Sequence, residues 1–193
     1  MKTRHCTTAA VSALAALLVG CSGKAEGWNY AIPKKICGVN MQESVVKPLL
    51  PPGDTLDEQI RAAIGEDQDV SERCLLKVDK GKSGDGKYLW INLDRETQKV
   101  DAVAEAHRLR YGNSESVHLA GSVTSAAVGD TGALVAMRCK PKTAKSAPYA
   151  YLMAEVRMGD YADKPKDPEA RHDHLQAFLR DYIPATEAAR CKQ

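Results

Sequence analysis

Five runs of apolar and aromatic residues, separated by glycine-rich or polar segments, predict β-strands. The runs span residues 74–78, 88–93, 123–128, 132–139 and 149–158. A glycine-rich turn joins the first two runs, and the segment 129–132 (Gly-Asp-Thr-Gly) predicts a hairpin turn between the third and the fourth. Because strands joined by short turns pair antiparallel, we expect an antiparallel sheet.

Two longer stretches have apolar residues at helical spacing and predict amphipathic helices. The first has its apolar face at Val100, Val103, Ala104, His107 and Tyr111. Gly112 ends this helix. The second begins with Asp167 as its cap and Pro168 at its first position, and its apolar face comprises Leu175, Phe178, Leu179, Tyr182 and Ile183. We expect Pro184 to bend or end the second helix, and a short alanine-rich turn to lead to Cys191.

The N-terminal part of the chain is less regular. Asn40 followed by Glu43 resembles a capping box and predicts a short helix that ends at the Pro-Pro-Gly segment 51–53. The next segment, 55–65, is ambiguous. A second capping box (Thr55 with Glu58) and one helical face (Leu56, Ile60, Ala63 and Ile64) favour a helix, whereas an irregular edge strand also fits these residues.

Together these elements predict an α+β fold, in which an antiparallel sheet is covered by helices on one face. The halves 28–112 and 113–193 are similar in order, since each has an Arg-Cys pair, a strand led by tyrosine and an amphipathic helix. Cys139 follows Cys74 by 65 residues, and Tyr151 follows Tyr88 by 63. An old duplication and two independent hairpin–helix units both explain this similarity.

Residues 1–20 are organised as a secretory signal peptide. Lys2 and Arg4 precede an apolar run of about 11 residues, which is too short to span a bilayer. The run ends in Leu-Val-Gly-Cys at 18–21, a bacterial lipobox, which predicts cleavage before Cys21 and attachment of lipid to its thiol. Two or three acyl chains anchor a protein firmly, because each buried methylene contributes about 0.8 kcal/mol. The alternative, a secreted protein with Cys21 in a disulfide, fits the residue pattern less well.

The predicted cleavage changes the charge of the chain. Of 27 lysines and arginines, Lys2 and Arg4 are removed, so 25 remain against 25 acidic residues. This balance argues against nucleic-acid binding and against a polybasic membrane patch. Residues 21–27 then form a short lipidated tether, and 28–193 form one extracytoplasmic domain that begins close to the lipid headgroups. Near this start, Trp28 and Tyr30 favour packing against the fold over contact with the membrane interface.

Four cysteines remain once Cys6 is cleaved away and Cys21 is lipidated. In an oxidising compartment an even number of cysteines usually forms disulfides. Three connectivities are possible, and we favour Cys37–Cys74 with Cys139–Cys191, each of which would link the two sides of a folded unit. A zinc site of four thiolates is disfavoured, because none of the four belongs to a CxxC pair.

Motifs for catalysis or cofactor binding are incomplete. The segment 79–83 lacks the residues that a phosphate-binding loop or a calcium loop requires, and we interpret it as part of a hairpin turn. The pair His172 and His174 lies two residues apart on the predicted helix, so the two rings point to different sides, and a solvated face is favoured over a metal site. His107 and His118 have no signature around them. We expect no metal, no cofactor and no catalytic residue.

Several segments resemble the uncharacterised actinobacterial surface lipoproteins. These are the lipobox 18–21, the segment 28–33 that leads to Cys-Gly at 37–38, Leu-Leu-Pro-Pro-Gly at 49–53, a cysteine-led strand that ends at 78–79, and a cysteine near the C-terminus. The resemblance covers most of the mature chain. It implies a surface lipoprotein of α+β type and transfers no catalytic residue.

The favoured hypothesis is a non-enzymatic binding or sensing module on the extracytoplasmic face of the cell membrane. Its partners would be the membrane, through the lipid on Cys21, and an envelope protein or ligand whose identity the motifs do not encode. Two alternatives remain open: an envelope enzyme whose site is assembled from scattered residues, and a structural subunit of an envelope complex.

Overall fold

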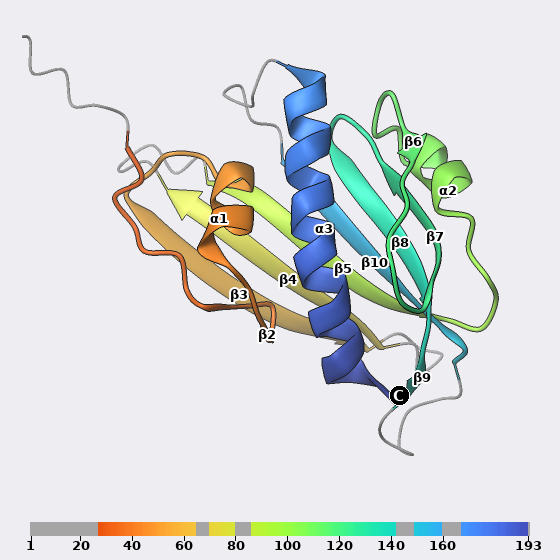
Figure 1. Ribbon diagram of the computed structural model, residues 1–193. Coiled ribbons are helices and arrows are strands. Elements are labelled where there is room, and N and C mark those ends of the chain that lie inside the picture. The colour runs from red at the N-terminus through yellow and green to blue at the C-terminus, as the bar shows by residue number, and fades with distance from the viewer. Residues whose placement is uncertain (1–26, 65–69, 80–85, 142–148, 160–166, 193) are drawn as a thin grey trace, which may run out of the picture.

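The computed structural model describes residues 27–64, 70–79, 86–141, 149–159 and 167–192, and these form an α+β fold. Seven antiparallel strands make the main sheet (Figure 1). In spatial order they are β3 (Thr55–Ile64), β4 (Val70–Asp79), β5 (Lys87–Glu96), β10 (Tyr151–Met158), β8 (Gly132–Arg138), β7 (Val123–Val128) and β6 (Glu115–Ser116). The predicted fold class and the predicted strands are confirmed.

Two small antiparallel pairs and four helical segments complete the described fold. The pairs are β1 (Lys35–Ile36) with β2 (Val39–Asn40), and β9 (Lys140–Pro141) with β11 (Cys191–Lys192). The helices are α1 (Glu43–Val46), the 3₁₀ turn η1 (Lys47–Leu49), α2 (Ala102–Arg108) and α3 (Pro168–Arg190). The predicted short helix before the Pro-Pro-Gly segment is therefore present. Its cap position is Gln42, which makes no side-chain capping hydrogen bond, and Asn40 lies in β2 instead.

Residues 55–64 of the ambiguous segment form the edge strand β3, so the helical alternative is wrong. β3 pairs with β4 along its whole length, from Thr55 opposite Asp79 to Ile64 opposite Val70. A strand of ten residues gains a full ladder of backbone hydrogen bonds from this neighbour. That gain comes from a partner distant in sequence, and it outweighs the local helical spacing of the apolar residues.

Helix α3 crosses one face of the sheet, with α1 beside it (Figure 1). The helix begins as predicted, because Asp167 accepts a hydrogen bond of 3.0 Å from the backbone N–H of Glu169, and Pro168 follows at the first position. The predicted apolar face is buried: Leu175, Phe178, Leu179, Tyr182 and Ile183 are each at most 1 % exposed. These side chains join the apolar residues of the facing strands in the larger core cluster.

Pro184 does not end α3, which continues to Arg190, so the predicted alanine-rich turn is wrong. A proline inside a helix removes one backbone hydrogen bond. Here the helix is held on both sides of Pro184, by the buried residues Ile183 and Thr186, and it ends at the disulfide-bonded Cys191. Tertiary packing therefore compensates for the missing bond.

Helix α2 packs on the opposite face of the sheet from α3, so the prediction that helices cover a single face is wrong. Ala102 and Ala106 of α2 form a second core cluster with Ala127 of β7 and Leu134 of β8. The strand residues on either side of these two belong to the cluster that contains α3. Because successive strand residues point to opposite faces, α2 and α3 lie on different sides. Helix α2 thus follows β3, β4 and β5 in the sequence but packs on β7 and β8 of the second half. The predicted duplication of the two halves stays a prediction.

Two disulfides connect segments that are far apart in the sequence. Cys37 is bonded to Cys74 with a Cα–Cα distance of 5.5 Å, and Cys139 is bonded to Cys191 with a distance of 5.1 Å. This is the pairing that the sequence analysis favoured. The first bond holds the β1–β2 hairpin against the sheet, and the second holds the end of α3 beside the end of β8.

Trp28 and Tyr30 bind the chain before the Pro-Pro-Gly segment to the fold. The indole N–H of Trp28 donates to the carbonyl of Leu50 (3.1 Å), and the Tyr30 hydroxyl donates to that of Pro51 (2.5 Å). Both aromatics therefore pack against the domain, although Trp28 is 42 % exposed.

The lipobox and Cys21 lie outside the described residues, and no helix within the described ranges has the length and apolarity needed to cross a membrane.

Candidate functional site

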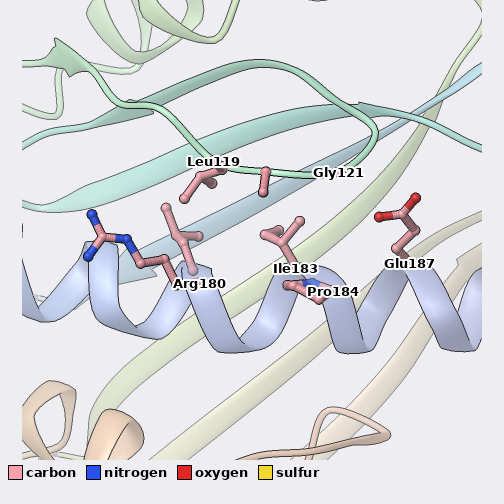
Figure 2. Close-up of a pocket in the computed structure, with 8 residues that line it drawn as sticks. Leu119, Gly121, Arg180, Ile183, Pro184 and Glu187 are labelled. Atoms are coloured by element: carbon pink, nitrogen blue, oxygen red, sulfur yellow. The ribbon is translucent and has the colours of Figure 1, made fainter.

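A groove of about 450 Å³ lies between α3 and the loop that precedes β7 (Figure 2). This volume falls within the range of small-molecule sites in proteins. Residues from two segments line it: Leu119, Ala120 and Gly121 from the loop, and Leu179, Arg180, Ile183, Pro184 and Glu187 from α3. The groove therefore has one helical wall and one loop wall.

The helical wall follows from the spacing of residues along α3. Leu179 and Ile183 are buried and form an apolar floor. Arg180, Pro184 and Glu187 follow at helical intervals beside that floor, so all three line the groove. Seven residues of helix rise about 10.5 Å, which separates the Cα atoms of Arg180 and Glu187. Figure 2 shows these two side chains at opposite ends of the groove.

The loop wall approaches α3 closely at Gly121. Its φ of +85° lies in the left-handed region, which glycine adopts without strain. A Cβ atom at this position would lie 3.1 Å from the Oε2 atom of Glu187. Leu119, which is 8 % exposed, packs into the core cluster and fixes the start of the wall. The sequence thus allows a narrow groove here because residue 121 has no side chain.

The charged groups of the groove lie at its ends. Arg180 is exposed and donates a hydrogen bond of 3.3 Å to the Gln176 side chain, whereas Glu187 is half-buried. The groove therefore offers a cation at one end and a carboxylate at the other.

His172 is enclosed by carboxylates, so the prediction of a solvated face is wrong for this residue. Its Nδ1 atom lies 3.1 Å from Oε1 of Glu115, and its Nε2 atom lies 3.2 Å from Oδ1 of Asp130. The side chain is only 12 % exposed. His174, the other histidine of the pair, is half-buried. Because β6 and the β7–β8 turn supply the two acids, His172 ties the first part of α3 to the second half of the sheet.

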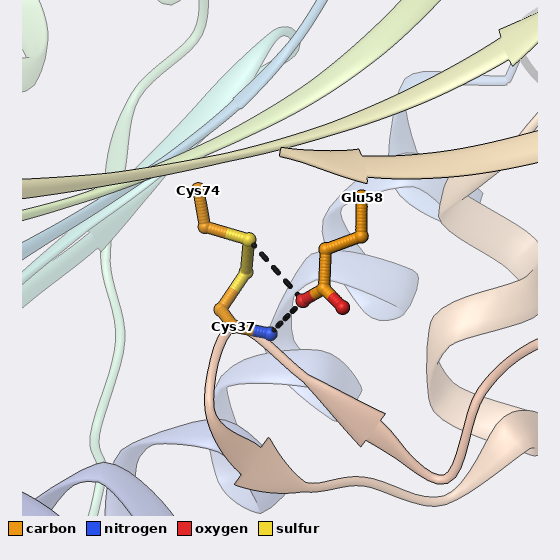
Figure 3. Close-up of side chains that lie close together, drawn as sticks. All are labelled: Cys37, Glu58 and Cys74. Carbon is orange, nitrogen blue, oxygen red and sulfur yellow. Dashed lines mark hydrogen bonds between the residues drawn. A yellow bond between two sulfur atoms is a disulfide. The ribbon is translucent and has the colours of Figure 1, made fainter. Parts of the chain in front are cut away.

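The cluster of Cys37, Cys74 and Glu58 brings potential ligand atoms together without forming a metal site (Figure 3). Both sulfurs are consumed in a disulfide, whereas a metal binds cysteine as a thiolate. Glu58 accepts a hydrogen bond of 2.5 Å from the backbone N–H of Cys37. The same carboxylate oxygen lies 3.6 Å from the sulfur of Cys74, which carries no hydrogen in the disulfide, so this is a contact only. Glu58 thus secures the β1–β2 turn, whose Cys37 has a φ of +51°.

The sheet face that carries α2 holds a polar network centred on Glu155. Its carboxylate accepts hydrogen bonds from the Tyr111 hydroxyl and from the Asn92 amide (2.7 Å), and Asn92 in turn accepts from Arg73 (3.1 Å). Burial and the bond to Glu155 raise the pKa of Tyr111 far above its ordinary value, so the phenol stays protonated and donates. These groups bind one another, and the network holds the end of α2 on the sheet.

Asp94 lies on the same face and has a perturbed pKa. Burial raises the pKa of its carboxyl, and the nearby charge of Glu155 raises it further. Perturbed acids mark candidate catalytic sites, but a general acid also needs a partner and a space for substrate. His107 and His118, the two histidines that would favour an enzyme, are both exposed and do not line the groove.

The remaining sites considered from the sequence fall largely outside the described residues. Cys21 and the turn residues 80–83 are among them. The groove, in contrast, is described and was missed by the sequence analysis. The spacing of Arg180, Pro184 and Glu187 was a signal for a shared stripe on α3. Nothing local indicates that Leu119–Gly121 closes over this stripe.

Comparisons of the chain with protein-family models, with curated proteins and with solved structures found no match.

Proposed function

We propose that the protein is a membrane-anchored extracytoplasmic lipoprotein that acts as a non-enzymatic binding module of the cell envelope, with the α3 groove as its ligand site. The lipobox at 18–21 supports the anchor, and the two disulfides are typical of an oxidising compartment. A tether of six residues, Ser22–Gly27, spans about 20 Å when extended, so the domain would begin close to the membrane surface.

The composition of the groove is the observation that carries this proposal. Its floor is apolar and its two charged side chains, Arg180 and Glu187, stand at its ends. Such a lining is typical of a site that orients a ligand by a few polar contacts. Its eight lining residues include no histidine, serine or cysteine, the usual bases and nucleophiles of covalent catalysis. Binding is therefore favoured over catalysis at this site.

The anchor is tested by labelling cells with radioactive palmitate and separating membranes from soluble protein. Wild-type chain should carry label and remain with the membranes, whereas Cys21→Ser should carry none and be released. Unlabelled wild-type protein would contradict the anchor.

Binding is tested by thermal unfolding of the purified chain with fractionated small molecules from the cell envelope. A fraction that binds should raise the melting temperature of wild type, since a ligand at 100 times its Kd stabilises by about 2.7 kcal/mol. Ala120→Trp, which fills the groove from an exposed position, should abolish the increase, and Ala104→Trp on the exposed side of α2 should retain it. Hydrolysis of an envelope substrate that Asp94→Asn abolishes would contradict the proposal in favour of an enzyme.

A further inference from the structure

We propose that the protein forms a symmetric dimer in which strand β3 pairs antiparallel with β3 of a second copy, so that the two main sheets join into one. Gln59 would lie at the two-fold axis of this dimer. The open edge of β3, the charges along it and a like-charge contact with β4 support such pairing, which does not involve the α3 groove.

Strand β3 forms one edge of the main sheet (Figure 1). It pairs with β4 over all ten of its residues without a register shift. Within the described ranges its other side faces no strand, so a row of backbone N–H and C=O groups is left as a template for one. A proline, a bulge or a short length often protects such an edge, and β3 itself has none of these. The opposite edge strand, β6, has only two residues.

Symmetry restricts which residues can face each other across the β3 edge. In a symmetric antiparallel pair the numbers of any two opposite residues add up to the same total. That total is even, because opposite residues point to the same face of the sheet. Centring the pair on Glu58 would place two glutamates opposite each other, and centring it on Ile60 would place Arg61 opposite a neutral glutamine. Centring it on Gln59 places Asp57 opposite Arg61 twice.

The charges on β3 are arranged for this register. Asp57 and Arg61 are exposed, and neither takes part in an ion pair within the described ranges. Lys77, which lies opposite Asp57 on β4, binds Asp79 instead (3.4 Å). Arg61 lies opposite Arg73 of β4, and like charges in that position destabilise a sheet. A second copy would place an aspartate on the other side of Arg61 and offset this repulsion.

The same pairing would cover an exposed apolar side chain. Ile60 is among the large apolar residues that are exposed in the single chain. In the dimer it would be the diagonal neighbour of Ile60 in the second copy, at the distance of about 7–8 Å that long side chains bridge across paired strands. Charges of one sign would protect an edge against every other strand, whereas the two signs on β3 select a strand of the same sequence.

The test is oxidative crosslinking in intact cells that express the full chain, with the wild-type chain as the control for its own cysteines. Gln59→Cys should form a covalent dimer, because opposite Cα atoms of an antiparallel pair lie about 4.5–5.5 Å apart, within the range of a disulfide. Asp57→Cys alone and Arg61→Cys alone should form none, since the two thiols lie about 14 Å apart along the strands. Co-expression of these two variants should give the mixed dimer.

Charge reversal in the Gln59→Cys chain tests the cause of the pairing. Asp57→Arg should lower the crosslinking rate about tenfold, because two attractive pairs become repulsive. Adding Arg61→Asp should restore the rate, since it reverses both pairs. Asp173→Arg, an equal change of charge at an exposed position of α3, should leave the rate unchanged.

Several results would overturn the dimer. One is the absence of a Gln59→Cys dimer, and another is a covalent product with a different protein in its place. Faster crosslinking of Ile60→Cys than of Gln59→Cys would contradict the register. So would a double charge reversal that fails to restore the rate lost in Asp57→Arg.

Discussion

Removal of the Cys139–Cys191 disulfide should lower the free energy of unfolding by about 4 kcal/mol. The bond joins residues 52 apart in sequence, and in the chain-entropy model a loop of this length restricts the unfolded chain by that amount. The perturbation is the double substitution Cys139→Ala and Cys191→Ala. Alanine is chosen because both positions are 2 % exposed, and a serine hydroxyl would add the separate cost of a buried polar group.

Equilibrium unfolding in urea measures the effect. With a slope of about 2 kcal/mol per molar urea, a loss of 4 kcal/mol lowers the midpoint by about 2 M. The matched control is Cys37→Ala with Cys74→Ala, whose residues are 37 apart. Because the entropic cost grows only with the logarithm of loop length, the two losses should differ by about 0.3 kcal/mol.

The bond also holds the last turns of α3, where Pro184 has already removed one backbone hydrogen bond. Amide exchange over residues 185–190 should therefore accelerate in the Cys139/Cys191 variant and not in the Cys37/Cys74 variant. A loss below about 1 kcal/mol at an unchanged urea slope would refute the loop-closure reasoning. So would a difference of several kcal/mol between the two variants.

Three further predictions concern buried groups on the two faces of the sheet. Phe178→Ala should cost about 3–5 kcal/mol in urea unfolding, because the ring is fully buried and stacked on its neighbour in α3; a loss below 1 kcal/mol would mean that the helix is loosely packed. His172→Ala should cost about 1 kcal/mol by the same measurement, since it removes the ring contacts to Glu115 and Asp130, whereas Asp130 keeps Asn113 and Arg171 as partners; an unchanged stability would show the contacts to be passive. Asp94→Asn should stabilise the chain at neutral pH, because burial and then Glu155 hold the pKa of this carboxyl above its ordinary value of 3.8 and its ionised form destabilises the fold. The gain should shrink as the pH falls through the raised pKa of the folded state and disappear well below 3.8, where Asp94 is protonated in both states, so a gain that is constant with pH would contradict this cause.

The sequence by itself determined the elements whose signals are local. The strand β7, the Asp167 cap and the buried face of α3 were predicted correctly, because a strand, a cap and a helix stripe each depend on residues within a few positions of one another. The α+β class followed from the order of these elements. The disulfide pairing was favoured on a different ground, since each pair brackets one folded unit.

Only the tertiary structure decided the features that need a partner distant in sequence. Segment 55–64 is a strand because β4 is available beside it, and α3 passes through Pro184 because the sheet and a disulfide hold it on both sides. His172 is enclosed because two other segments place acids against its ring. The groove likewise exists only because Leu119–Gly121 folds back onto α3. Local spacing fixes which residues share a face, whereas the free energy of long-range pairing and packing fixes what that face meets.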